Sequence, residues 1–298
     1  MRYQLLIHFT RKSSLRASFA KQSHDRVRDC FVTKNVPRND SAKHELLFTN
    51  YSLLFKRMSL AHTLSHHALD KVQQRLHLRE IGNPYLTLTS PMSPAPVGMA
   101  RVFTGERIRK MVYIGLTVAP IGLDSHMFFA FTPPDSLVPH FTLDSVLAGP
   151  HFAFHLDLIP RVDLGANLEY LNAAFQPLTA EFDSARKIEG LTPAQLSPRQ
   201  YALISPWMLA FRANETAFAQ IEKHVDAYLE HWFGLVEHGV KASVTSDAST
   251  LAARDQANRD AIFNPGVDPV WAQVERLIGA PMGEKLRALL RNHEVERE

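Results

Sequence analysis

The stretch from Pro139 to Asp163 has the clearest pattern of apolar and polar positions in the chain. It predicts two strands joined by a tight turn at residues 148–150. In the second strand, large apolar side chains alternate with His151, Ala153, His155 and Asp157. Because successive side chains on a strand point to opposite faces, one face should be core and the other polar. This pattern indicates either a sheet that covers a cavity or a half-exposed edge strand with a solvated face.

Asp144 lies in the middle of the first of these strands, among apolar residues. Burial there disfavours the charged carboxylate and favours a protonated acid that can donate a proton. We therefore interpret Asp144 as a candidate catalytic acid. The alternative is a structural acid paired with a nearby base such as Arg161.

The wider pattern predicts strands first and helices afterwards. An amphipathic helix at residues 64–78 precedes the sheet. Four further extended runs follow at residues 85–89, 99–104, 110–118 and 125–131. Their connections are too short for crossover helices, so the strands should form an antiparallel meander of about six. Helices are then predicted at residues 168–175, 215–238, 249–262 and 269–291. Six strands followed by helices make an α+β domain with helices layered on the sheet.

The helix at residues 215–238 carries a second candidate acid. Val225 and Leu229 define its buried stripe, and Asp226 lies one residue from that stripe. Asp226 is therefore expected either to point into the cleft between helix and sheet or to lie on the solvated helix surface. Two carboxylates facing each other across a cleft would protonate a substrate that is receiving electrons.

Composition places the chain among soluble globular proteins, with 45% hydrophobic and 21% charged residues in a length of 298. No run of 18 or more apolar residues predicts a membrane span. The single cysteine, Cys30, excludes an intramolecular disulfide and any Cys-rich metal or iron–sulfur site built from this chain alone. A reducing, cytoplasmic setting fits this cysteine usage best.

Charge divides the chain at residue 57. Residues 1–57 hold twelve Lys or Arg and four acids, a net charge of +8, whereas the remainder holds 21 basic and 26 acidic residues, a net charge of −5. This removes the case for nucleic-acid binding by the folded body. We expect residues 1–57 to be an unstructured basic leader or a mis-assigned start before Met58, and residues 58–298 to be a single domain. If the leader is instead a transit peptide, the protein is expected in a plastid.

The fifteen histidines raise the question of a metal site. His151 and His155 share one strand face, and Asp157 would complete a His/His/Asp set. Metal sites usually draw ligands from more than one element, so we favour a pocket lining and expect no metal. No phosphate loop, dinucleotide fingerprint, nucleophile elbow or metalloprotease helix is present.

The 139–171 stretch resembles the red chlorophyll catabolite reductase family. The matching motif is Leu-Asp-Leu-Ile-Pro-Arg-Val-Asp-Leu at residues 156–164, followed by Glu-Tyr-Leu at 169–171. Residues 197–206 and the His-Val-Asp of residues 224–226 occur in the same order as in that family. The tail, residues 254–290 with Asp268-Pro269, is similar to the end of the sister group, the ferredoxin-dependent bilin reductases.

The resemblance implies a three-layer α/β/α sandwich that binds an open-chain tetrapyrrole between the sheet and the C-terminal helices. It further implies an oxidoreductase acting on CH-CH groups with no bound redox cofactor, which takes single electrons from ferredoxin in a radical mechanism. Asp144 matches the family's sheet acid and Asp226 its helix acid, although the chlorophyll catabolite branch usually has Glu at the position of Asp144. The expected substrate is therefore a bilin or a chlorophyll catabolite.

The pocket and the partner surface follow from these expectations. The candidate substrate-binding residues are His126, His140, His151, His155, Arg161 and His224. Ferredoxins are generally acidic, so the candidate docking residues are Arg101, Arg107, Arg109 and Lys110, with a solvated hairpin as the alternative. We expect a monomer or a homodimer. The competing functions are a non-catalytic tetrapyrrole carrier and a reductase of another large conjugated substrate.

Overall fold

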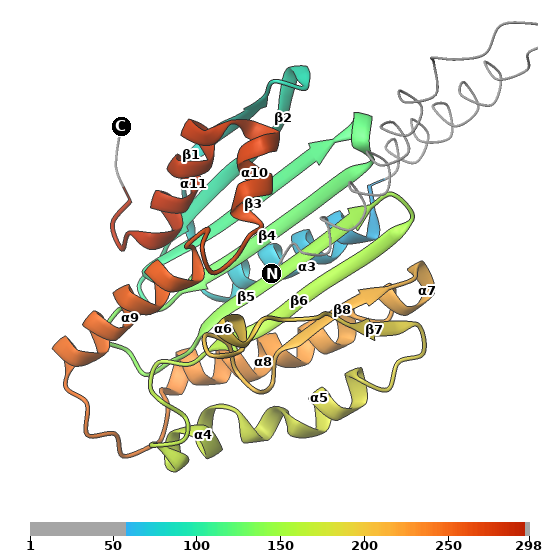
Figure 1. Cartoon of the computed structure of the whole chain (residues 1–298). Helices are drawn as coiled ribbons and strands as arrows, with labels where there is room; N and C mark the ends of the chain where they lie inside the picture. The colour runs from blue at the N-terminus through green and yellow to red at the C-terminus, as the bar shows by residue number, and fades with distance from the viewer. Residues whose placement is uncertain (1–57, 296–298) are drawn as a thin grey trace, which may run out of the picture.

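The computed structural model describes residues 58–295, which fold around one eight-stranded sheet (Figure 1). The basic leader expected at residues 1–57 lies outside the described residues. Within them, no helix is long and apolar enough to cross a membrane.

Every neighbouring pair in the sheet is antiparallel, in the order β1-β2-β3-β4-β5-β6-β8-β7. The strands are β1 (Arg79–Ser90), β2 (Ser93–Thr104), β3 (Lys110–Val118), β4 (Leu123–Phe131), β5 (His140–Ala148), β6 (His151–Ile159), β7 (Leu191–Pro193) and β8 (Leu209–Ala213). The first six are successive neighbours, which confirms the predicted meander. The two added strands were not predicted, because they are three and five residues long and lie in a Pro-rich passage.

Helices cover both faces of the sheet, which confirms the predicted α+β class and its three layers (Figure 1). One layer contains α3 (Leu60–Arg75), α4 (Leu168–Ala174), α5 (Thr179–Ala185), α7 (Glu215–Phe218) and α8 (Glu222–His238). The opposite layer contains α9 (Ala248–Ile262), α10 (Trp271–Ile278) and α11 (Ala280–Arg291), and we call it the C-terminal layer. Each layer buries its own hydrophobic core against the sheet.

Two of the predicted helices are interrupted. The helix expected at residues 269–291 is divided by Gly279, whose φ of 85° ends α10 before Pro281 begins the first turn of α11. The helix expected at residues 215–238 is divided into α7 and α8. A single helical turn, α6 (Pro198–Tyr201), lies between β7 and β8.

The side-chain alternation of β5 decides which layer each of its residues meets. Phe141 and Leu143 join the core beneath α3 and α8, whereas Val146 joins the core beneath the C-terminal layer. Asp144 is in phase with Val146 and therefore faces the C-terminal layer. Since β5 has β4 and β6 as neighbours, Asp144 lies in the interior of the sheet.

Candidate functional site

Asp144 and His155 form a buried acid–imidazole pair on the sheet. They stand directly opposite each other on β5 and β6, and His155 Nδ1 lies 3.7 Å from Asp144 Oδ2. Their exposed fractions are 1% and 5%. A carboxyl group and an imidazole at this separation can hold and pass protons while water is kept away from them.

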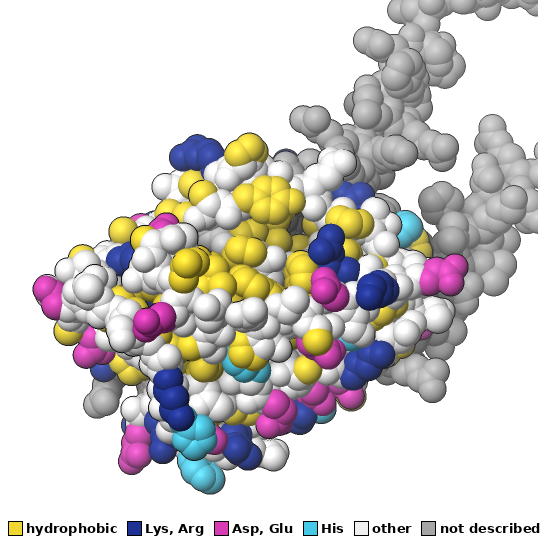
Figure 2. Space-filling model, turned by 90° about the horizontal axis from the view of Figure 1, so that it is seen from below, with side chains coloured by type: hydrophobic (Ala, Val, Ile, Leu, Met, Phe, Trp, Pro, Cys, Tyr) yellow, Lys and Arg dark blue, Asp and Glu magenta, His cyan; other side chains and the backbone are white. Residues whose placement is uncertain are grey.

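The pair adjoins a pocket between the sheet and the C-terminal layer. Apolar side chains form most of the pocket wall, and His155 and Asp268 are the ionisable groups in it. One side is a segment that we call the wall segment, residues 194–208, which includes Leu196, Leu203 and Met208. The molecule also carries hydrophobic side chains around a hollow on the face seen in Figure 2. An apolar cleft with a few convergent polar groups is the usual form of a small-molecule site.

The pocket is small in this conformation. The cavity has a volume of about 40 Å³, whereas sites for drug-sized ligands have volumes of roughly 300–1,000 Å³. A tetrapyrrole would therefore require the pocket to widen.

Asp268 was not predicted as a site residue. It lies between α9 and α10, is 5% exposed, and accepts a hydrogen bond from the backbone N–H of Val270 at 3.2 Å. The sequence pattern explained Asp268 as the residue that begins a helix before Pro269. The one other signal was that Asp268 lies in the tail segment that resembles the bilin reductases. The structure brings it to the same pocket as His155.

Asp226 lies on the opposite side of the sheet from Asp144, so the expectation that they face each other across one cleft is wrong. The space between α8 and the sheet is filled by core residues, among them Val225 and Trp232. Asp226 instead bonds to α3, with His67 Nε2 and Lys71 Nζ each at 2.8 Å. Partial burial opposes ionisation, but these two bonds hold the pKa of Asp226 below its usual value.

His126 also faces α3 rather than the pocket. Its partner across the strands is Ser145, whose hydroxyl donates to the backbone oxygen of Ala61 at 2.7 Å. His126 Nδ1 lies 2.7 Å from the hydroxyl of Tyr113, and Nε2 lies 3.0 Å from Asp124 Oδ1. The strand register therefore removes His126 from the predicted substrate-binding set.

His224 belongs to the same helical layer as Asp226. It is 1% exposed on α8, and its Nδ1 pairs with the carboxylate of Glu181 on α5. This contact joins two helices on the far side of the sheet from Asp144, so His224 is likewise removed from the predicted set.

His140 and Arg161 lie in a buried ionic cluster with Asp255 of α9. His140 Nε2 is 2.6 Å from Asp255 Oδ1, and Arg161 pairs with the same oxygen. Burial, with the nearby charge of Arg161, lowers the pKa of His140 to about 3, so this histidine is neutral. Arg161 pairs with Asp255 and not with Asp144, which excludes the alternative that Asp144 is the structural partner of Arg161. The cluster attaches α9 to the sheet.

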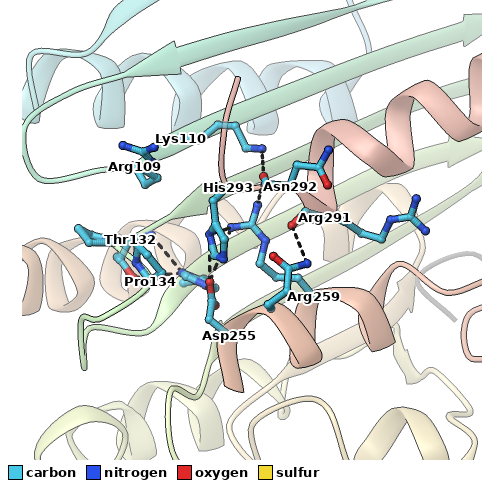
Figure 3. Close-up of polar contacts among 12 residues, drawn as sticks. Arg109, Lys110, Thr132, Pro134, Asp255, Arg259, Arg291, Asn292 and His293 are labelled. Carbon is cyan, nitrogen blue, oxygen red and sulfur yellow. Dashed lines mark hydrogen bonds and ion pairs between the residues drawn. The ribbon is translucent and has the colours of Figure 1, made fainter. Parts of the chain in front are cut away.

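The cluster continues to the end of the C-terminal layer (Figure 3). Arg259 donates to the backbone oxygens of Leu290 and Asn292 at 2.7 and 2.8 Å, and His293 lies 3.4 Å from Asp255. Nζ of Lys110 donates to the backbone oxygens of Leu289 and Asn292. Arg259 and Lys110 thus donate to carbonyls at the end of α11, where the helix carbonyls lack partners.

The predicted docking residues have different environments. Lys110 is fully buried, and burial lowers its pKa to about 6, so its assignment to a surface patch is wrong. Arg101 is engaged by Glu80 through two bonds of 2.8 and 2.7 Å. Arg107 and Arg109 are exposed between β2 and β3.

The remaining candidates share the strand face of Asp144. His151 is exposed at the start of β6. Asp157 is fully buried and accepts bonds from the backbone N–H and hydroxyl of Ser205 at 3.1 and 2.5 Å, so it anchors the wall segment. Among residues 58–295, no three His, Cys, Asp or Glu side chains are arranged to hold a metal ion.

The fold is that of a known bilin-binding protein. The described structure superposes on phytochromobilin synthase from tomato, solved in complex with biliverdin, with a TM-score of 0.62 and 20% sequence identity. The match covers 78% of this chain and 82% of the tomato protein. No protein-family model matches the sequence, and no curated protein matches it. The similarity therefore establishes a shared fold.

Proposed function

We propose that the protein reduces a linear tetrapyrrole, either a bilin or a chlorophyll catabolite, with electrons delivered singly by ferredoxin. The observation that carries the proposal is the buried Asp144–His155 pair beside an apolar pocket beneath the C-terminal layer. The likeness to a synthase crystallised with biliverdin supports a bilin as the ligand.

In the proposed reaction, one carbon–carbon double bond of the pigment takes up two electrons and two protons. Ferredoxin supplies the electrons in two steps, and no redox cofactor of the protein's own is required. Asp144 and His155 donate protons from the sheet side of the pocket, and Asp268 is placed to donate from the side of the C-terminal layer. Exclusion of water protects the radical intermediate from side reactions.

Asp144 and His155 have different roles in the proposed reaction. His155 lines the pocket, and Asp144 stands beside it on the neighbouring strand, with Oδ2 3.7 Å from His155 Nδ1. We infer that His155 orients the carboxyl group and returns a proton to it between electron transfers. Asp226 has no part in this proposal, because it lies on the other side of the sheet.

Ferredoxin docking is assigned to the exposed arginines of the β2–β3 connection. Arg107 donates to the backbone oxygen of Glu237 at 3.0 Å, and Arg109 pairs with Glu294. Both side chains are accessible to the acidic surface of a ferredoxin.

Absorbance tests the proposal. Under anoxia, the full chain is mixed with biliverdin, ferredoxin and a reducing system, and the expected result is loss of the long-wavelength band of the pigment. The same mixture without ferredoxin should show no loss. Tight binding of both biliverdin and a chlorophyll-derived tetrapyrrole without any spectral change under turnover conditions would reject an enzyme and favour the carrier.

A further inference from the structure

Gln200 is a buried glutamine that lines the pocket from the wall segment. It belongs to α6, the single helical turn between β7 and β8, and is 7% exposed. The polar side chains of the pocket lining are His155, Gln200 and Asp268. The proposed function assigns His155 and Asp268 to proton transfer, so it leaves Gln200 without a role.

Ser197 fixes the orientation of the Gln200 amide group. Oε1 of Gln200 accepts hydrogen bonds from the backbone N–H of Ser197 at 3.0 Å and from the Ser197 hydroxyl at 2.9 Å. Because a backbone N–H can only donate, the amide oxygen must face Ser197 and the amide nitrogen must face away from it. Both bonds lie within the wall segment, so this orientation does not depend on the width of the pocket.

The amide nitrogen of Gln200 is a donor without an acceptor. Nε2 carries two N–H groups, and neither makes a hydrogen bond to any residue in the part of the chain that the structure describes. An unpaired donor on a mostly buried side chain costs free energy, which an acceptor on a ligand recovers. A fixed donor in the lining of an apolar pocket therefore indicates a hydrogen-bond acceptor of the ligand as its partner.

The chemistry of the pocket favours a neutral acceptor. The pocket lining contains neither Lys nor Arg, so a carboxylate beside Gln200 would lose its water without gaining a counter-charge. A linear tetrapyrrole ends in rings that carry amide-like carbonyl groups, which are neutral acceptors. Electrons added to the conjugated system increase the negative charge on such an oxygen, and a fixed N–H donor stabilises that charge.

We propose that Gln200 donates a hydrogen bond to the carbonyl oxygen of a terminal ring of the substrate, and that Ser197 holds the amide in the donating orientation. This inference rests on the proposed function and deepens it. It assigns one end of the pigment, rather than its middle, to the pocket that His155 lines. Gln200 then determines which ring lies beside the proton donors.

The test measures the affinity for biliverdin and the carbonyl stretching frequency of the bound pigment. Absorbance titrations and infrared difference spectra are recorded on the full chain without ferredoxin, so that binding is read independently of turnover. Gln200→Glu keeps an oxygen for both Ser197 bonds and removes the amide donor, so it should bind biliverdin about tenfold more weakly than wild type. A terminal carbonyl band should move to higher frequency, because a hydrogen bond to the oxygen lowers that frequency. Gln200→Met removes the donor without adding a charge and should cause the same upward shift.

Gln74→Glu is the matched control, because Gln74 is exposed on α3 in the opposite helical layer. It should match wild type in both affinity and carbonyl frequency. Thermal unfolding should show that Gln200→Glu is folded, since Glu replaces Gln in a capping box without loss of its bonds. An unchanged carbonyl frequency in both Gln200 variants would overturn the inference and leave the proposed function standing. Failure of wild type to bind biliverdin would reject the bilin function, and this inference with it.

Discussion

Asp144 and Asp226 lie on opposite faces of the same sheet, the first beneath the C-terminal layer and the second bonded to α3. One carboxyl group is almost completely buried beside a pocket, whereas the side chain of the other is 32% exposed and held by Lys71 and His67. The two acids therefore have separate roles, and substitutions that remove their charge should separate chemistry from stability.

Asp226→Asn is expected to lower stability slightly. The ion pair is partly exposed, so solvent screening limits its contribution to about 1 kcal/mol or less. Thermal unfolding at neutral pH should detect this loss, and Lys71→Gln should produce a similar one. A double variant that loses no more than either single variant would show that both act through one interaction.

Ser205→Ala should loosen the wall segment. The substitution removes a 2.5 Å hydrogen bond to the buried carboxylate of Asp157, at a cost of about 1–3 kcal/mol. Urea unfolding measures that cost, and amide hydrogen exchange should show faster exchange in residues 194–208 than in wild type. Ser184→Ala, in α5 of the opposite layer, is the control. Unchanged exchange in the wall segment would contradict the assigned anchoring.

Stability should fall as the pH is lowered from about 6.5 to 4. Burial, reinforced by His62, lowers the pKa of His66 to about 4, and burial with Arg161 lowers that of His140 to about 3. Both are neutral when folded, whereas in the unfolded chain they take up protons near pH 6.5. The unfolded state therefore binds more protons in this window, so the free energy of unfolding decreases as the pH falls.

Urea titrations at several pH values measure this slope. His66→Asn should reduce it, and the substitution of the exposed His238 by Asn should leave it unchanged. If the free energy of unfolding falls with pH equally steeply in wild type and His66→Asn, the burial of His66 does not cause the loss of stability at acid pH.

The sequence predicted the sheet and its acid because alternation in β5 and β6 depends only on neighbouring residues. It could not predict that Asp226 misses the pocket. A helical stripe identifies the buried side of α8, but not which face of the sheet that side covers. His126 was misplaced for a related reason: its face is set by the register of β4 against β5, in which His126 pairs with Ser145 and not with Asp144.

Asp268 and strand β8 escaped prediction because one lies in an irregular connection and the other is a short strand. Asp268 was fully explained as a helix start, and its place beside His155 depends on how the α9–α10 connection packs. Strand β8 is only five residues long, and it pairs with β6 across the whole of residues 160–208. Contacts between residues so far apart in the sequence produce no local periodicity of apolar positions, so the sequence pattern could not predict them.

We propose that protonation from Asp144 drives reduction of a linear tetrapyrrole. The most direct measurement is the anaerobic single-turnover rate of biliverdin reduction by reduced ferredoxin, in Asp144→Asn and Asp226→Asn, with pigment affinity measured for each. Asp144→Asn should bind the pigment and reduce it at least about a hundredfold more slowly than wild type, as expected for loss of a general acid. Asp226→Asn should stay within about twofold of wild type, since it perturbs only the partly exposed contacts with α3 on the other side of the sheet. Equal rates in wild type and Asp144→Asn, or an equal loss in both variants, would contradict the account.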